Sequence, residues 1–155
     1  MKKTCIISLI CLCIDQIIKF FLYRFLDIGS SIILIKNFFN ITLVYNEGAA
    51  FSILLSQRVL LILISIFVLI FLYFYLKKEK NMDKYEYIFY GILTGGILGN
   101  LTDRLFRGAV IDYLDFNIFG YAFPIFNFAD MCIVCSVILI IIKSIRDDKN
   151  GISSK

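Results

Sequence analysis

Long apolar runs separated by shorter polar segments dominate the chain, and four of these runs have the length of a membrane helix. They cover roughly residues 4–23, 59–76, 85–105 and 128–145. Each run contains about 18 to 21 residues, and a helix needs about 20 to cross the hydrocarbon core of a bilayer. The pattern predicts a bundle of four transmembrane helices within a single membrane domain that comprises residues 1–155.

The first run also has a feature of secretory signal peptides, because it follows the basic start Met1-Lys2-Lys3. Asp15 and Lys19 interrupt its apolar region, and no small-residue cleavage pattern follows it, so we interpret it as a retained helix. Asp15 and Lys19 lie four positions apart and therefore share one face of that helix, where they can form an ion pair. We expect this pair to support the structure and to tie the first helix to loops at the outer surface.

Two segments between the runs carry other patterns. In residues 39–46, apolar side chains stand at every second position, a period of two that is typical of a strand. These side chains are Phe39, Ile41, Leu43 and Tyr45. Residues 32–35 form a second run, which is rich in β-branched residues. Both are expected to belong to a small extracytoplasmic β-sheet. Residues 106–127 are rich in Phe and Tyr, and we expect an interfacial loop or short helix there. The expected fold class is an all-α membrane protein, a four-helix bundle with this small sheet and interfacial segment.

Basic residues are divided unevenly between the two sides of the membrane that four spans would define. An even number of spans puts both termini on one side, which holds ten basic residues against five on the other. The ten are Lys2, Lys3, Lys77, Lys78, Lys80, Lys84, Lys143, Arg146, Lys149 and Lys155, and the five are Arg24, Lys36, Arg58, Arg104 and Arg107. Because cytoplasmic segments carry the excess of Lys and Arg, we predict that both termini are cytoplasmic.

Composition excludes several classes of protein. Hydrophobic residues make up 60% of the chain, more than a soluble domain of this size carries. The net charge of +4 fits basic segments that face anionic lipid headgroups, so no nucleic-acid partner is expected. The chain has no histidine, which excludes Ser-His and Cys-His nucleophile pairs and His-ligated metal sites. Its cysteines fall within the predicted spans, and we expect no metal and no other cofactor.

The third run carries two rows of residues, each with a spacing of four. One row is Gly91, Gly95, Gly99 and Asp103, and the other is Gly96, Asn100 and Arg104. Small residues at this spacing allow neighbouring helices to approach closely, which predicts that the third helix is central in the bundle. Its outer end would then place an amide, a carboxylate and a guanidinium in a polar pocket. The alternative is that these polar residues only cap the helix end and solvate it.

Several carboxyl groups lie near the outer ends of the third and fourth runs. Asp130 stands at the start of the fourth run, where a carboxyl is partly removed from water. If Asp112 approaches it, the two groups cannot easily both ionise and would share a proton. Aspartic proteases use this arrangement, in which an ionised carboxylate activates water and a protonated one assists the carbonyl. Spacing alone does not establish that the two carboxyls meet.

Five motifs in order resemble those of lipoprotein signal peptidases, also called signal peptidase II. They are DQIIK (15–19), NEGAAFS (46–52), GGILGNLTDR (95–104), VIDYLDF (110–116) and FNFAD (126–130). The resemblance covers nearly the whole chain. It implies an aspartyl protease of the bacterial inner membrane, with its active site at the outer face, and we expect the protein to act as a monomer. Its substrates would be prolipoproteins, cleaved just before a cysteine that already carries diacylglycerol, and its other partners would be membrane lipids.

The same resemblance implies a role for each matching residue. It makes Asp112 and Asp130 the catalytic pair, and it leaves Asp115 outside that pair. The residues that shape the site and hold the substrate would be Asn46, Gly48, Asn100, Asp103, Arg104 and Asn127, and the supporting pair would be Asp15 and Lys19. Two positions depart from the family pattern: Met131 replaces the usual serine, and Phe123 replaces a common tryptophan before Pro124.

A non-enzymatic function is the alternative. Asp15, Lys19, Asp103 and Asp130 could form a proton relay in a small transporter. Such a relay should place ionisable residues through the depth of the bilayer, whereas these residues cluster towards one side. The second and fourth runs, moreover, have apolar centres. A membrane-assembly factor, a third class, would not need this set of carboxylates.

Overall fold

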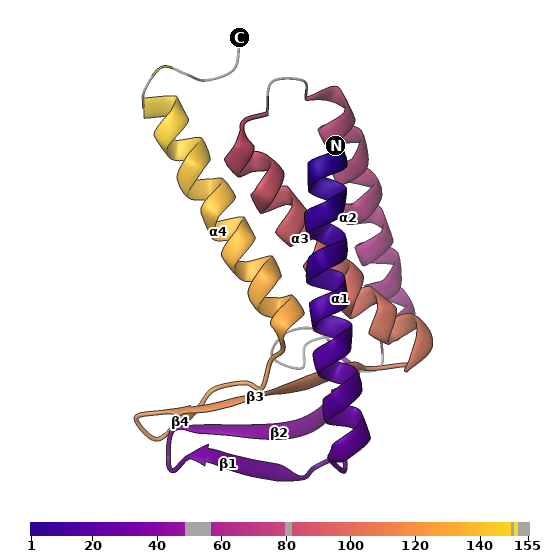
Figure 1. Ribbon diagram of the computed structural model, residues 1–155, viewed down its shortest axis with the longest axis vertical. Coiled ribbons are helices and arrows are strands. Elements are labelled where there is room, and N and C mark those ends of the chain that lie inside the picture. The colour runs from indigo at the N-terminus through magenta and orange to yellow at the C-terminus, as the bar shows by residue number, and fades with distance from the viewer. Residues whose placement is uncertain (49–56, 80–81, 150, 152–155) are drawn as a thin grey trace.

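Four helices and a four-stranded sheet make up the described part of the chain, which is residues 1–48, 57–79, 82–149 and 151 of a computed structural model. The helices are α1 (Lys2–Phe25), α2 (Arg58–Lys78), α3 (Lys84–Phe106) and α4 (Phe128–Lys149). The four predicted runs are therefore all helical, as expected, and each helix extends slightly beyond its apolar run. The helices run alongside one another, and the start of α1, at the N-terminus, lies at the same end of them as the last turn of α4 (Figure 1).

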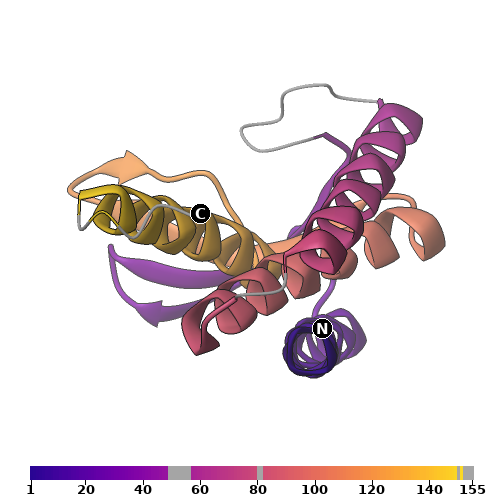
Figure 2. The ribbon, with the colours of Figure 1, turned by 90° about the horizontal axis from the view of Figure 1, so that it is seen from above.

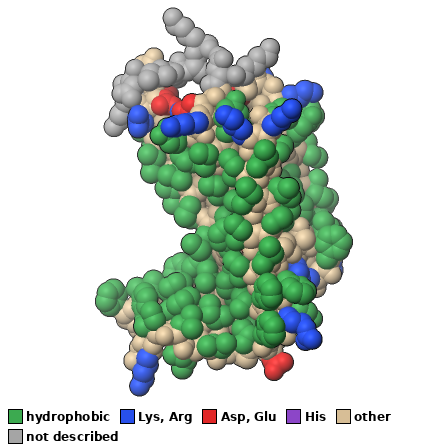
Figure 3. All heavy atoms as spheres, in the orientation of Figure 1, with side chains coloured by type: hydrophobic (Ala, Val, Ile, Leu, Met, Phe, Trp, Pro, Cys, Tyr) green, Lys and Arg blue, Asp and Glu red, His purple; other side chains and the backbone are tan. Residues whose placement is uncertain are grey.

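Three of the described helices, α1, α2 and α4, are long and apolar enough to cross a membrane. Helix α3 has a similar length, but polar residues lie near both of its ends. Lys84 and Glu86 are in its first turn, and Asn100, Asp103 and Arg104 are in its last two turns. Length and composition thus establish three candidate spans where we predicted four. Hydrophobic side chains cover most of the visible helix surface, and Lys and Arg side chains gather at the end that holds the termini (Figure 3). Apolar surface exposed on this scale is expected to face lipid.

The sheet is antiparallel, with the strand order β1-β2-β3-β4. Strands β1 (Ser31–Ile35) and β2 (Phe39–Asn46) confirm the two strands that we predicted. Strands β3 (Val110–Ile118) and β4 (Tyr121–Ala122) occupy the segment for which we expected a loop or short helix, and that expectation was wrong. Most of the first half of β3 is buried on both faces, so it lacks the alternation that identified β2.

The sheet crosses the end of the helices opposite to the termini and extends beneath α4 (Figures 1 and 2). Leu43 of β2 and Ile111 and Tyr113 of β3 form a buried cluster that joins the sheet to the helices. Ile18 of α1 and Phe128 of α4 pack against this cluster. The sheet is therefore held at the point where α1 and α4 meet it, beside the polar ends of the helices.

Helix α3 is central because Gly95 and Gly96, one from each row, face different helices. A Cβ atom at Gly95 would lie 2.6 Å from the Cβ of Cys11 and 2.7 Å from the carbonyl oxygen of Ser8, both on α1. A Cβ atom at Gly96 would lie 2.6 Å from the carbonyl oxygen of Ala129 on α4. The absence of side chains at these positions lets α1 and α4 pack directly against the backbone of α3, which confirms the central position that the spacing predicted.

Gly95→Ala is expected to lower the free energy of unfolding by about 1–3 kcal/mol, because the added methyl group overpacks the contact between α1 and α3. The nearest atoms belong partly to the backbone of α1, so a change of rotamer cannot relieve the clash. Thermal unfolding in detergent would measure the loss, with Thr94→Ala as a control that removes volume from the same helix. A variant that unfolds at the wild-type temperature would contradict this close packing.

Candidate active site

Asp112 of β3 and Asp130 in the first turn of α4 meet through Asn127, the residue that precedes α4. The side-chain Nδ2 of Asn127 donates a hydrogen bond of 2.6 Å to Oδ1 of Asp112. Its backbone N–H donates to Oδ2 of Asp130 at 3.2 Å, and its Oδ1 accepts from the backbone N–H of Asp130 at 3.0 Å. The reciprocal pair resembles a capping box, so the start of α4 and the connection to Asp112 are stabilised together.

Two more asparagines complete the contacts of this pair. Asn46 of β2 donates from Nδ2 to Oδ2 of Asp112 at 2.8 Å. Asn100 of α3 donates from Nδ2 to Oδ1 of Asp130 at 2.7 Å. Each of the four carboxyl oxygens therefore accepts one hydrogen bond from an asparagine. These donors, from one strand, a helix and the start of another helix, fix the orientation of both carboxyl groups.

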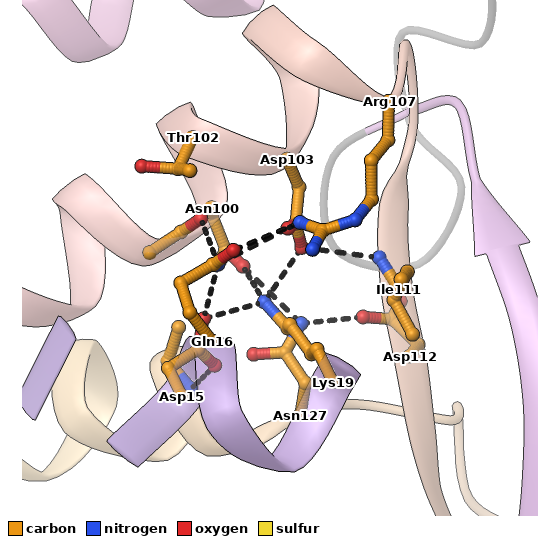
Figure 4. Close-up of polar contacts among 12 residues, drawn as sticks. Asp15, Gln16, Lys19, Asn100, Thr102, Asp103, Arg107, Ile111, Asp112 and Asn127 are labelled. Carbon is orange, nitrogen blue, oxygen red and sulfur yellow. Dashed lines mark hydrogen bonds and ion pairs between the residues drawn. The ribbon is translucent and has the colours of Figure 1, made fainter. Parts of the chain in front are cut away.

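A buried ionic cluster of Asp15, Lys19 and Asp103 contacts Asn100 (Figure 4). Lys19 of α1 lies 2.9 Å from a carboxyl oxygen of Asp15 and 2.7 Å from one of Asp103. Its Nζ also donates to Oδ1 of Asn100 at 3.2 Å. The predicted ion pair between Asp15 and Lys19 is confirmed, but the expectation that it ties α1 to surface loops was wrong. Asp15 instead accepts from the backbone N–H of Ala129 at 3.1 Å, so the pair links α1 to α3 and α4.

Asp103 has partners other than its sequence neighbour Arg104. Its Oδ1 pairs with Arg107, one helical turn further along, and its Oδ2 accepts from the backbone N–H of Ile111 at 3.3 Å. Adjacent residues on a helix do not face each other, whereas residues four apart do, which explains why Arg107 and not Arg104 is the partner. Asp103 therefore joins the ionic cluster to β3, next to Asp112.

Gln16 of α1 is a second residue that sequence reasoning missed. Its Nε2 donates to Oδ1 of Asp103 at 3.1 Å, and its Oε1 accepts from Arg107 at 2.8 Å. The spacing of Asp103 and Arg107 could have identified the arginine, but nothing in the local pattern distinguishes Gln16 from a surface residue. The ionic cluster is therefore contacted by the amides of Gln16 and Asn100 and by the guanidinium of Arg107.

Arg104 turns the other way and contacts the end of β2. Its guanidinium donates to the carbonyl oxygen of Gly48 at 2.9 Å. The backbone N–H of Gly48 donates in turn to Oδ1 of Asn46 at 2.9 Å, the same side chain that holds Asp112. The structure thus brings Asn46, Gly48 and Arg104 together beside the carboxyl pair. The remaining motif residues, Ala49 to Ser52, lie outside the described residues.

Burial raises the pKa of Asp112 above its ordinary value, and the negative charge of Asp130 raises it further, to about 6. The hydrogen bonds from Asn46 and Asn127 act in the opposite direction and only partly offset the effect. Asp112 therefore changes its protonation state near neutral pH, well above the range of a solvated aspartate. A carboxyl with this behaviour can hold or release a proton under physiological conditions.

Asp115 lies apart from the carboxyl pair. It accepts hydrogen bonds from Thr42 at 2.6 Å and from Asn40 at 3.3 Å, both on β2. These contacts connect two neighbouring strands, so Asp115 has a structural role in the sheet. Met131, which departs from the family pattern, is exposed on the surface of α4 and contributes no polar contact to the pair.

The chain is similar to one known protein family and to solved structures of bacterial membrane enzymes. A family model described as signal peptidase (SPase) II matches residues 7–146. One solved structure, described as a bacterial membrane enzyme determined by the in meso method at 2.3 Å, is 35% identical with a TM-score of 0.90, over 100% of this chain and 94% of that chain. Another of the same description, at 1.9 Å, is 37% identical with a TM-score of 0.82, over 92% of each chain.

Proposed function

The chain belongs to the signal peptidase II family, and from that premise we propose that it is an aspartic endopeptidase in which Asp112 and Asp130 are the catalytic residues. Membership in this family means that the protein is a bacterial membrane peptidase that removes signal peptides from lipoproteins. The family also implies that cleavage occurs just before a cysteine that carries diacylglycerol. No metal or other cofactor is needed for this chemistry, because a pair of carboxyl groups can activate water.

The observation that carries the proposal is the set of four asparagine hydrogen bonds on the two carboxyl groups. Burial, and after it the negative charge of Asp130, raises the pKa of Asp112 to about 6. In the proposed reactive form the pair shares one proton, which Asp112 carries while Asp130 is ionised. Asp130 then removes a proton from the attacking water while Asp112 donates its proton to the carbonyl oxygen of the scissile bond. Asp130 then gives the proton that it took from water to the leaving amine, and the C–N bond breaks as the carbonyl re-forms and returns its proton to Asp112.

We propose further that α3 is a fourth span, that both termini are cytoplasmic and that the site opens at the outer membrane surface. The excess of basic residues on the terminal side supports this orientation. The polar end of α3 is buried, with Asn100 and Asp103 paired to α1 and α4, which offsets the cost of placing it at the membrane. We propose too that the chain forms one domain and acts as a monomer, because its described residues alone supply the hydrogen bonds to both carboxyl groups.

The proposed function is tested with purified protein in lipid bilayers and a prolipoprotein that carries a diacylglyceryl cysteine. A shift in electrophoretic mobility would report removal of the signal peptide, and mass spectrometry would identify the new N-terminus. The same substrate without the lipid is the control, and it should be cleaved poorly or not at all. Proton flux into liposomes without any cleavage would favour the relay alternative.

Labelling at the loop between α2 and α3 is expected to place it in the cytoplasm. Lys78 is exposed at the end of α2, so a cysteine introduced there should react with a thiol reagent that enters the cell. A membrane-impermeant reagent added to intact cells should not reach it, in a background that lacks the native cysteines. Rapid labelling by the impermeant reagent would reverse the proposed orientation.

The value of kcat/KM for cleavage is expected to fall as pH rises through about 6. Asp112 holds its proton below its raised pKa and loses it above, and the reaction needs one protonated and one ionised carboxyl. The competent form therefore disappears on the alkaline side of this value. Initial rates in a series of buffers would test the dependence, after a check that the protein regains full activity on return to low pH. A rate that increases steadily through the same range would reverse the assigned proton positions.

A further inference from the structure

Arg58, the first residue of α2, binds the carboxyl end of α3. The last carbonyl groups of a helix lack partners within it and need other donors. At the end of α3, the carbonyl oxygen of Asp103 accepts from the backbone N–H groups of Arg107 and Gly108, at 2.7 and 3.1 Å. The next two carbonyl groups accept from the Arg58 side chain: Nε lies 2.7 Å from the oxygen of Arg104, and a terminal nitrogen lies 3.2 Å from that of Leu105.

One of these two carbonyl groups belongs to Arg104, whose side chain contacts Gly48 beside the carboxyl pair. Arg104 is held by Arg58 through its main chain, and its own side chain holds the carbonyl oxygen of Gly48. Gly48 in turn donates to the Asn46 side chain, which donates to Asp112. A continuous series of hydrogen bonds therefore runs from the start of α2 to a carboxyl group of the proposed site.

We infer that Arg58 is a positioning residue for peptide cleavage: by fixing the end of α3, it keeps Arg104, Gly48 and Asn46 in the arrangement that orients Asp112. This inference rests on the proposed function. Arg58 makes no contact with either carboxyl group among the described residues, so its effect must pass through Arg104. Its planar guanidinium, with donors in a fixed fork, suits two successive carbonyl groups better than a single ammonium does.

Arg58 could instead serve only to cap α3, and two measurements separate these roles. A simple cap would change the unfolding temperature and leave the chemistry of the folded protein unaltered. A positioning residue changes kcat in the folded protein and also changes the proton affinity of Asp112, because the Asn46 hydrogen bond lowers that pKa. The charged groups that face Asp112 from the other elements, Asp130, Lys19 and Arg104, are retained in every variant below.

The experiment compares Arg58→Ala, Arg58→Gln and Arg58→Lys with the wild type, using a lipidated prolipoprotein. Arg24→Ala is the matched control, since Arg24 is an exposed arginine in the last turn of α1. We expect Arg58→Ala to lower kcat by roughly 10- to 100-fold with little change in KM, as for other small displacements of catalytic groups. The fall of kcat/KM with pH should move to higher pH, and Arg58→Lys should recover part of the rate.

If Arg58→Ala is too unstable to purify, Arg58→Gln, which keeps one amide donor, is measured in its place. Three results then decide the role of Arg58. Folded variants with wild-type kcat and an unchanged pH profile would overturn the inference, even if their unfolding temperature fell. Failure of the wild-type protein to cleave any lipidated substrate would instead refute the proposed function itself. A rate loss that Arg58→Lys partly restores, with the pH shift, would establish the positioning role.

Discussion

Asp112→Asn and Asp130→Asn are each expected to reduce cleavage of a lipidated prolipoprotein by roughly 10³-fold or more, because each carboxyl has a role that the other cannot fill. Asparagine keeps the size of the side chain and can keep one of the two hydrogen bonds that the replaced carboxyl accepts, because its NH2 group accepts none. Each variant also loses the proton that the pair shares. The measurement is the initial rate with each purified variant, after its insertion and unfolding temperature have been compared with those of the wild type.

The double variant should be little slower than either single one, since members of one catalytic unit are not additive. Asp115→Asn is the matched control, because it makes the same chemical change on the same strand as Asp112. Its partners are Thr42 and Asn40, so its cleavage rate should stay close to that of the wild type. Near-normal cleavage by either Asp112→Asn or Asp130→Asn would end the assignment of the catalytic pair.

Lys19→Met is expected to lower the free energy of unfolding by about 3–5 kcal/mol, the cost typical of removing one member of a buried ionic cluster. Lys19 is 0% exposed and lies between Asp15 and Asp103, which are also completely buried. Methionine fills a similar volume but leaves Asp15 without any cation among the described residues. Asp103 keeps only Arg107. Thermal unfolding in detergent would measure the loss.

Asp15→Asn should destabilise the protein less than Lys19→Met does. Reasoning from the sequence alone, one would expect this change to leave Lys19 unpaired, but Lys19 retains Asp103 as a partner. Lys143→Met is the matched control: this lysine pairs with Asp83 at 3.1 Å but is partly exposed, so its loss should cost about 1 kcal/mol or less. Equal unfolding temperatures for Lys19→Met and Lys143→Met would contradict the importance of the buried cluster.

The features that could be predicted from the sequence are those that repeat along one element. Hydrophobic runs identified all four helices, and alternation identified β2. The four-residue spacing of Gly91, Gly95 and Gly99 indicated a central helix, and the same spacing identified the ion pair of α1. Each of these patterns reflects a face that one element presents to its surroundings, so neighbouring residues carry the information.

The features that could not be predicted depend on how separate elements meet. Strand β3 gave no alternation, because residues 110–113 are buried on both faces. Asn127 contacts both carboxyl groups because β3 lies beside the start of α4. No local sequence pattern predicts that placement. The same holds for the ion pair between Asp103 and Arg107 and for the contacts of Gln16 with both. In each case the partner is set by packing between helices and not by sequence distance.

The polar end of α3 has a consequence for how the protein enters the membrane. Asn100, Asp103 and Arg104 would each oppose partition of α3 into lipid as an isolated helix, since charged residues are costly on insertion scales. The buried partners of Asn100 and Asp103 are supplied largely by α1, which is synthesised earlier, and by α4, which follows. On the proposed four-span topology, we therefore expect α3 to be retained in the bilayer only once both α1 and α4 supply these partners.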